Sequence, residues 1–298
     1  MNKLNSHCRG LGAFVACAAA LCGGASLAAD GEPEATEGES SGLVVSAESY
    51  VGVDSRYVTY GVTDGKDPIV RMNGYATFLD WWYIGGEMLF DVTKGNGKRG
   101  EYGNRAGKLT TLDVQTGLAH EFGLGETLGT LCVDFYFTYE WLPRHHGSMS
   151  DTDYLDVEFK LKDLWLEPKL WIERDLMADD GFYVNLEVGH TFPLVGDGKD
   201  AALTLRPSFA QGVGNTLRTR GYGLADDHGG LMDSTVKCEL SWAVCEHVKI
   251  KAYVAYSDYW FDRTLRHGAR AHNGAWGHGD KYATSWNFYG GVGVAFSF

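Results

Sequence analysis

Apolar and polar residues alternate along most of this chain, in runs of about ten to fourteen residues that begin near residue 45. In the run 131–141, Val133, Phe135 and Phe137 fall on one side, and Asp134 and Thr138 fall on the other. A period of two indicates a β-strand with one apolar face and one polar face. About twelve such runs follow one another, so we predict an all-β fold.

Short and long segments alternate between the runs. This pattern of loop lengths is a signal separate from the apolar and polar alternation inside the runs. The short connections lie at 80–81, 123–127, 163, 193–200 and 245–247. The long polar ones lie at 94–108, 143–151, 214–230 and 261–284. Transmembrane barrels have short periplasmic turns and long external loops, whereas a soluble sandwich has no reason to sort its loops. We therefore predict a transmembrane antiparallel up-and-down β-barrel of about 12 strands, with both termini in the periplasm.

The last run, WNFYGGVGVAFSF at 286–298, is apolar or aromatic at every second position except Gly290. Such an apolar strand would aggregate unless both of its edges were paired, and closing a barrel pairs them. The last strand of a soluble β-sandwich is the alternative for this run alone. A terminal strand that ends on Phe resembles the last strand of bacterial outer-membrane barrels, which the assembly machinery reads. The resemblance implies that Phe296 and Phe298 form a C-terminal assembly signal, with the assembly machinery and outer-membrane lipid as partners.

Composition agrees with a membrane barrel. Aromatic residues make up 13% of the chain, which suits girdles at two membrane interfaces. Glycine is frequent at 40 residues and proline is rare at 6, as uninterrupted strands with tight turns require. The net charge of -13 argues against nucleic acid as a partner.

The first 43 residues are predicted to lie outside the barrel. Lys3 and Arg9 precede an apolar core, and small residues end near Ala28, so residues 1–28 are typical of a secretory signal peptide. Residues 29–43 are acidic and lack aromatic side chains, so we expect a disordered periplasmic linker. The barrel is expected to span 44–298.

The cysteines divide between the signal segment and the barrel. Lipidation at Cys17 or Cys22 is the less favoured alternative to simple cleavage, because neither has a good acceptor context. Cys132, Cys238 and Cys245 remain, and we expect free thiols that face lipid. A disulfide between Cys238 and Cys245 is the alternative in an oxidising compartment.

The start of the barrel carries a short motif. It reads SRYV at 55–58, GV at 61–62 and DGK at 64–66, followed by Pro68. This stretch is similar to the opening strand of the TorF-type porins of Gram-negative outer membranes. The chain departs from that family at Thr59-Tyr60, where an aromatic residue followed by arginine is expected. The resemblance implies a small pore.

Charged residues on the strands are expected to line the lumen, because Lys or Arg facing lipid costs about 2–4 kcal/mol at mid-depth. Among them carboxylates outnumber cations, so we expect a porin-like channel for passive diffusion of small hydrophilic solutes, with a preference for cations. Arg56 and Arg71 are predicted to set its narrowest point. The predicted pore-lining residues are Arg56, Arg71, Glu87, Asp113, Asp134, Glu140, Glu158, Lys160, Arg206, Lys237, Glu239 and Lys251.

Two other functions stay open at this stage. Side chains can fill the lumen of a barrel of this size, which would make it an occluded structural or adhesive barrel. An outer-membrane lipid hydrolase is less favoured, because His120 and His190 lie on strands without an adjacent Ser. We therefore predict no catalytic residue and no enzymatic activity.

Histidines gather in the last long connection, at His267, His272 and His278, with Asp262 and Asp280 nearby. Their spacing in a glycine-rich segment fits no compact ligand pattern. We expect solvated loop histidines, and we predict no metal and no cofactor.

Overall fold

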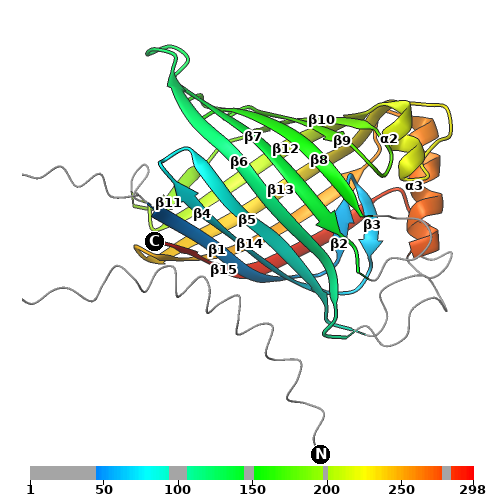
Figure 1. The fold of residues 1–298 in the computed structure, drawn as a ribbon, viewed down its shortest axis with the longest axis horizontal. Helices are drawn as coiled ribbons and strands as arrows, with labels where there is room; N and C mark the ends of the chain where they lie inside the picture. The colour runs from blue at the N-terminus through cyan, green and yellow to red at the C-terminus, as the bar shows by residue number, and fades with distance from the viewer. Residues whose placement is uncertain (1–44, 94–105, 144–150, 197–200, 277–282) are drawn as a thin grey trace, which may run out of the picture.

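The computed structural model describes residues 45–93, 106–143, 151–196, 201–276 and 283–298. The predicted signal peptide (1–28) and acidic linker (29–43) lie outside the described residues. Within these ranges, twelve antiparallel strands follow one another around a closed barrel (Figure 1). They are β1 (Val45–Asp54), β4 (Ile69–Phe78), β5 (Trp82–Asp91), β6 (Leu109–Gly123), β7 (Thr130–Trp141), β8 (Thr152–Leu161), β9 (Lys169–Asp175), β10 (Phe182–Gly189), β12 (Leu203–Gly214), β13 (Gly230–Cys245), β14 (Val248–Asp258) and β15 (Asn287–Ser297).

Two pairings close the ring. β1 pairs with β15, with Val51 opposite Val294. β10 pairs with β12, and the short strand β11 (Phe192–Val195) extends the same ladder after a two-residue break. The barrel therefore has no open edge along these strands, as a barrel in lipid requires.

The two faces of the wall differ as the alternation predicts. Large apolar side chains point outward and stay exposed, for example Phe135 at 44% and Val292 at 54%. The side chains between them point into the lumen and are mostly polar or small. A closed barrel with an apolar exterior is the architecture of outer-membrane proteins. The structure thus confirms the predicted transmembrane barrel and its outer-membrane location. No helix among the described residues is long and apolar enough to cross a membrane.

Both ends of the barrel wall lie at the same end of the barrel, where β1 begins and β15 finishes (Figure 1). The short connections gather there, including 79–81, 124–129 and 246–247. This is the periplasmic end by the usual distribution of loop lengths. The longer connections lie at the opposite, external end, and three of them contain secondary structure.

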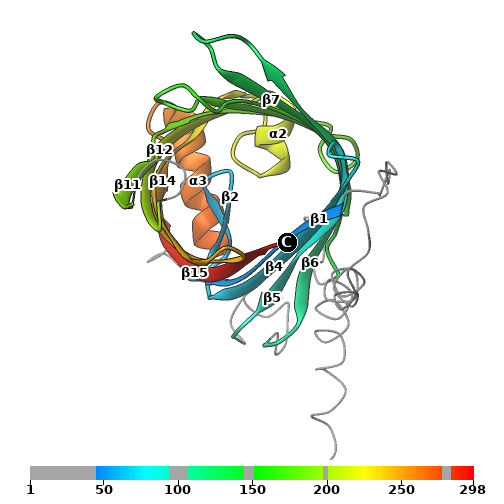
Figure 2. The same cartoon turned by 90° about the vertical axis from the view of Figure 1, so that its left-hand side faces the viewer.

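The first of these connections corrects the expected first strand. Alternation through Tyr57 and Thr59 was predicted to continue that strand, but β1 ends at Asp54. The next residues form a separate hairpin of β2 (Tyr57–Thr59) and β3 (Val62–Gly65). Tyr60 and Gly61 have φ angles of 46° and 79°, as a tight two-residue hairpin turn requires. The hairpin lies inside the outline of the barrel when the barrel is seen end-on (Figure 2).

Helices occupy the two connections that follow β12 and β14. α2 (Thr216–Gly221) begins at the cap residue Asn215, and α3 (Arg263–Trp276) follows Asp262, whose Oδ1 accepts from two backbone N–H groups. The 261–284 segment was predicted to be a polar loop, so α3 corrects that prediction. The helices and the hairpin pack together at the external end of the lumen (Figure 2). Their apolar contacts are Val62, Tyr183, Leu224, Met232, Tyr259, Leu265 and Ala269.

Candidate functional site

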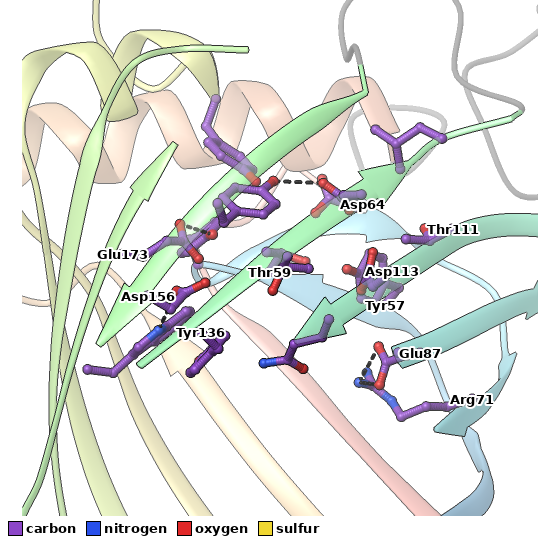
Figure 3. A pocket seen from close by; sticks show the side chains of 18 of the residues that line it. Tyr57, Thr59, Asp64, Arg71, Glu87, Thr111, Asp113, Tyr136, Asp156 and Glu173 are labelled. Carbon is purple, nitrogen blue, oxygen red and sulfur yellow. Dashed lines mark hydrogen bonds and ion pairs between the residues drawn. The ribbon is translucent and has the colours of Figure 1, made fainter. Parts of the chain in front are cut away.

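A cavity of about 420 Å³ lies in the lumen beneath this packed external end. The hairpin forms one side of the cavity, and strands β4 to β9 form most of the rest (Figure 3). Tyr222, which follows α2, completes the lining. Its lining includes six carboxylates but only one arginine among the described residues, Arg71. We call this space the acidic cavity. Its carboxylates are Asp64, Glu87, Asp113, Glu140, Asp156 and Glu173.

Three of these carboxylates form a row across neighbouring strands. Glu87 on β5 lies directly opposite Asp113 on β6, and Asp113 lies directly opposite Glu140 on β7. Side chains in such positions have Cβ atoms about 4.5–5.5 Å apart, and like charges there are destabilising. The row therefore places three carboxyl groups in direct opposition on one side of the cavity.

Arg71 balances only one end of that row. Its guanidinium lies 2.9 Å from both oxygens of Glu87, and its Nε donates to Asp54 Oδ2 at 2.8 Å. Asp113 Oδ1 is buried and accepts no hydrogen bond from the described residues. Tyr154 donates to Glu140 Oε2 at 2.7 Å, which satisfies an oxygen without supplying a positive charge. The middle of the row therefore has no cation of its own among these contacts.

A second group of carboxylates lies on β8 and β9. Asp156 is directly opposite Glu173, and Trp171 Nε1 donates to Asp156 at 2.8 Å. Glu173 accepts from Tyr60 of the hairpin turn at 2.5 Å and from Arg218 of α2 at 2.8 Å. Figure 3 places Glu173 and Asp156 at one side of the cavity and Glu87 and Asp113 at the other. These contacts attach the hairpin and α2 to the barrel wall.

Arg218 is the most buried charge at the external end, with 0% of its surface exposed. Besides Glu173, its guanidinium lies 3.3 Å from Asp179 and 3.9 Å from Asp175, and it stacks over the ring of Tyr60. Burial opposes its charge, but Tyr60 and Glu173 outweigh burial and hold the pKa of Arg218 above its ordinary value. Arg218 is therefore a permanent cation that joins α2, the hairpin and β9.

Aromatic side chains fill the space between the carboxylates. Six tyrosines and Trp171 line the cavity. Burial, with Glu140 and Asp113 nearby, raises the pKa of Tyr57 well above its ordinary value. Burial and Asp64 do the same to the pKa of Tyr222. Both phenols therefore stay neutral, and the cavity offers ring faces and hydroxyls beside carboxylate groups.

Charges in the lumen below the cavity are arranged differently. Lys169 lies 3.2 Å from Glu158, and Arg206 lies 2.6 Å from Glu187. Lys237 donates to Glu239 at 2.8 Å. These six residues form what we call the paired-charge belt, which lies nearer the periplasmic end. In the belt each carboxylate has a basic partner within hydrogen-bond or ion-pair distance.

The twelve residues predicted to line the pore fall into three places. Arg71, Glu87, Asp113 and Glu140 line the acidic cavity. Arg56 does not line it, and its guanidinium donates to Asn287 Oδ1 at 3.2 Å. The others lie on inward-facing strand positions below the cavity, and they are Asp134, Glu158, Lys160, Arg206, Lys237, Glu239 and Lys251.

Other cavity residues were missed as site residues. Asp156 and Glu173 follow the inward alternation of β8 and β9, so the sequence carries a signal for them. Tyr57, Asp64 and Tyr222 come from connections, whose position inside the barrel depends on packing and leaves no local pattern.

Two predictions about individual side chains are wrong. His272 was expected in solvent, but its side chain is 9% exposed, with Nδ1 2.9 Å from Tyr222 O and Nε2 3.4 Å from Asp64. Cys132 was expected to face lipid, yet it shares the inward face of β7 with Asp134.

Cys132, Cys238 and Cys245 are free thiols. The described residues contain no group of three His, Cys, Asp or Glu side chains arranged for a metal ion.

The two histidines considered for hydrolysis lie near the periplasmic end. Both were predicted on strands, but His190 lies in the break between β10 and β11. His120 is on the outward face of β6, beside Phe122 with ring centroids 4.6 Å apart. His190 Nδ1 lies 2.6 Å from the backbone oxygen of Trp165. Its ring nitrogen therefore contacts a carbonyl rather than the carboxylate of a catalytic group.

Comparison with known proteins gives matches to solved structures only. No family model matches the chain, and no curated protein matches it. The NanC porin covers 84% of this chain and 98% of its own length, at 11% identity and a TM-score of 0.47. The KdgM porin matches 85% of this chain and 99% of its own length, at 11% identity and a TM-score of 0.45. Pseudomonas aeruginosa OpdQ matches 83% of this chain and 57% of its own length, at 10% identity and a TM-score of 0.34. The TorF-type resemblance stays a prediction.

Proposed function

We propose that this protein is an outer-membrane channel through which small hydrophilic solutes diffuse passively, with a preference for cations. The observation that carries the proposal is the acidic cavity inside a closed barrel with a polar inner face. The hairpin enters the lumen there and narrows it, so solutes would pass close to the carboxylates (Figure 2).

The charge of the cavity supports the preference for cations. Carboxylates grouped in a narrow space with low-dielectric walls raise the local concentration of cations and repel anions. Arg71 is the cation on the cavity wall, and it is shared between Asp54 and Glu87. In the belt, by contrast, opposite charges compensate each other, so the cavity would control selectivity.

The test is the reversal potential of refolded protein in planar bilayers under a potassium chloride gradient. We expect conductance with a potential of the sign for cation preference. Asp113→Asn combined with Glu140→Gln removes two charges from the row and should reduce that preference. Glu158→Gln combined with Glu239→Gln removes two paired charges from the belt and should change it less. Preference for anions in the wild-type channel would contradict the proposal.

An occluded barrel is the second candidate, and a specific observation favours it. Leu265 and Ala269 of α3 pack against Val62 of the hairpin and Met232 of β13, which fills part of the external end. If this packing stays closed, the protein is a structural or adhesive barrel. Absence of conductance at every salt concentration, from protein that migrates as folded, would favour this candidate.

A further inference from the structure

The carboxylates of the acidic cavity have fewer basic partners than their close spacing requires for charge balance. Glu87, Asp113 and Glu140 repeat along one row at the spacing between strands, about 4.8 Å. Among the residues that the structure describes, only the Glu87 end contacts an arginine. Direct opposition of like charges is destabilising. A bound cation that bridges Asp113 and Glu140 would remove this penalty.

Unsatisfied oxygen atoms give a second observation, separate from the count of charges. The side chain of Asp64 is 4% exposed, and its Oδ1 accepts no hydrogen bond from the part of the chain that the structure describes. Its nearest basic atom is His272 Nε2, at 3.4 Å. Asp113 Oδ1 is a second buried oxygen that accepts no hydrogen bond within the described ranges. Buried polar atoms usually have partners, so two such oxygens on one cavity indicate a ligand that donates hydrogen bonds.

The rings on the same cavity narrow the class of ligand. Tyr57 of the hairpin and Tyr136 of the wall line the cavity together with the carboxylates (Figure 3). Faces of tyrosine and tryptophan attract ammonium groups, and they pack against aliphatic chains. The cavity thus combines repeated carboxylates with apolar surface between them.

A single inorganic ion matches only part of this arrangement. It would meet one or two carboxylates and make no use of the rings. A transition-metal site is not formed either, because the part of the chain that the structure describes has no cluster of three ligand side chains. A chain of ammonium groups joined by short aliphatic segments matches both the repeat of the carboxylates and the rings.

We propose that the acidic cavity binds linear aliphatic polyamines, with successive ammonium groups on Glu140, Asp113 and Asp64 and the aliphatic segments against the rings. This inference deepens the proposed function and rests on it for transport, because it names the cations that the channel would admit. Binding itself does not depend on conduction.

The experiment uses spermidine with the full-length, refolded protein. Calorimetry measures its affinity in detergent, and planar bilayers measure its block of the potassium current. We expect spermidine to bind more tightly than n-butylamine, which has one ammonium group, and more tightly than Mg²⁺, which has charge without an aliphatic chain. The double variant Asp113→Asn with Glu140→Gln should lower the affinity for spermidine by about tenfold or more, because hydrogen bonds to charged groups are lost.

Matched variants keep the result interpretable. Glu158→Gln with Glu239→Gln removes the same charge from the belt and should leave spermidine affinity nearly unchanged. If the cavity double variant does not fold, Tyr57→Leu tests the ring contact on the hairpin without altering the barrel wall. The Tyr57→Leu variant should lose more affinity for spermidine than for Mg²⁺.

The outcomes separate this inference from the proposed function. A potassium current with no preference for spermidine over n-butylamine leaves the channel intact and overturns the inference. Equal loss of spermidine affinity in the cavity and belt variants also overturns it. Spermidine binding that depends on the cavity, in a protein without current, supports the binding site and contradicts the channel.

Discussion

The acidic cavity and the paired-charge belt lie in the same lumen and share strands β8 and β9, yet their charges are arranged in opposite ways. In the belt, Arg206 lies 2.6 Å from Glu187 and Lys169 lies 3.2 Å from Glu158. In the cavity, Asp113 faces Glu87 on one side and Glu140 on the other. Both regions obey the same inward alternation, so alternation alone does not set their electrostatics.

The difference lies in the partners around each charge rather than in register alone, because the belt residue Lys169 is also directly opposite a like charge, Lys160, but contacts Glu158. A lumen only needs polar side chains, and oppositely charged neighbours satisfy that need at the least cost in stability. The belt follows this solution and contributes to the wall. The cavity keeps like charges in register with two unsatisfied oxygens, which is costly for stability alone. Regions that depart from the stable solution are where function is expected.

The largest effect is expected from Arg218→Met, which would break the closure above the cavity. The variant leaves Glu173, Asp175 and Asp179 without the cation they share. Removing one partner from a buried ion pair costs about 3–5 kcal/mol. We expect α2 and the hairpin to leave the lumen before the barrel unfolds, and the conductance to rise. Urea titration in lipid vesicles and single-channel recording measure the two effects.

Arg174→Met is the matched control for this prediction. Arg174 donates to Asp180 at the same end of the barrel, and their side chains are 31% and 63% exposed. Exposed pairs contribute about 0–1 kcal/mol, so this variant should unfold almost as the wild type does. Equal losses of stability in the two variants would show that burial of Arg218 is not the cause.

A smaller effect is expected from Gly61→Ala, which targets the turn of the hairpin. Gly61 has a φ of 79°, and an added Cβ would lie 2.4 Å from the Cβ of Asp233. The strained backbone costs about 1–3 kcal/mol, and the contact adds to it. The hairpin should leave the cavity part of the time, which would appear as larger and noisier current. Gly107→Ala has a similar φ but open space, so it tests strain without the contact.

Arg71→Ala tests the cavity directly, and Arg206→Ala makes the same change in the belt. Loss of Arg71 frees Asp54 and Glu87, so conductance and cation preference should both rise. Adding Arg56→Ala should change little, because Arg56 bonds Asn287 away from the cavity lining. The effect should fade near 1 M salt, where the screening length is about 3 Å. A larger response from Arg206→Ala would assign control of selectivity to the belt.

The smallest effect concerns α3, which packs at the external end of the lumen. Burial raises the pKa of Asp262, but the N–H groups of Leu265 and Thr264 and the side chain of His228 outweigh burial and lower it. A lowered folded-state pKa means that the contribution is present at neutral pH and is lost as pH falls through that pKa. We expect faster hydrogen exchange in α3 at acid pH, with about 1 kcal/mol lost. Asp262→Ala should lose this pH dependence.

Sequence alone predicts the wall of this barrel well, because each strand carries its own period of two. Glu87, Asp113 and Glu140 are assigned to the lumen by that period. Their arrangement in one row is not predicted, because register depends on pairing between strands that no single strand encodes. The contrast between cavity and belt therefore appears only in three dimensions.

The connections are predicted less well, for two physical reasons. Tyr57 and Thr59 alternate like strand residues because they do form a strand, but in a hairpin rather than in the wall. α3 is polar on average, and its two glycines and two histidines offset its alanines and arginines, so local preference indicates a helix only weakly. Packing of Leu265 and Ala269 against the hairpin supplies the stability that local sequence lacks.

The seam between β1 and β15 has a consequence for the order of the strands. Its hydrogen bonds, such as Ala47 N–H to Phe298 O at 3.0 Å, are of the same kind as those of every other pair in the ring. In a closed ring of equivalent strand pairings, no strand is the first by virtue of its pairing. Rejoining the chain across this seam and cutting it at the 79–81 turn would keep every ladder intact. Order of synthesis, rather than stability, then distinguishes one strand from the next.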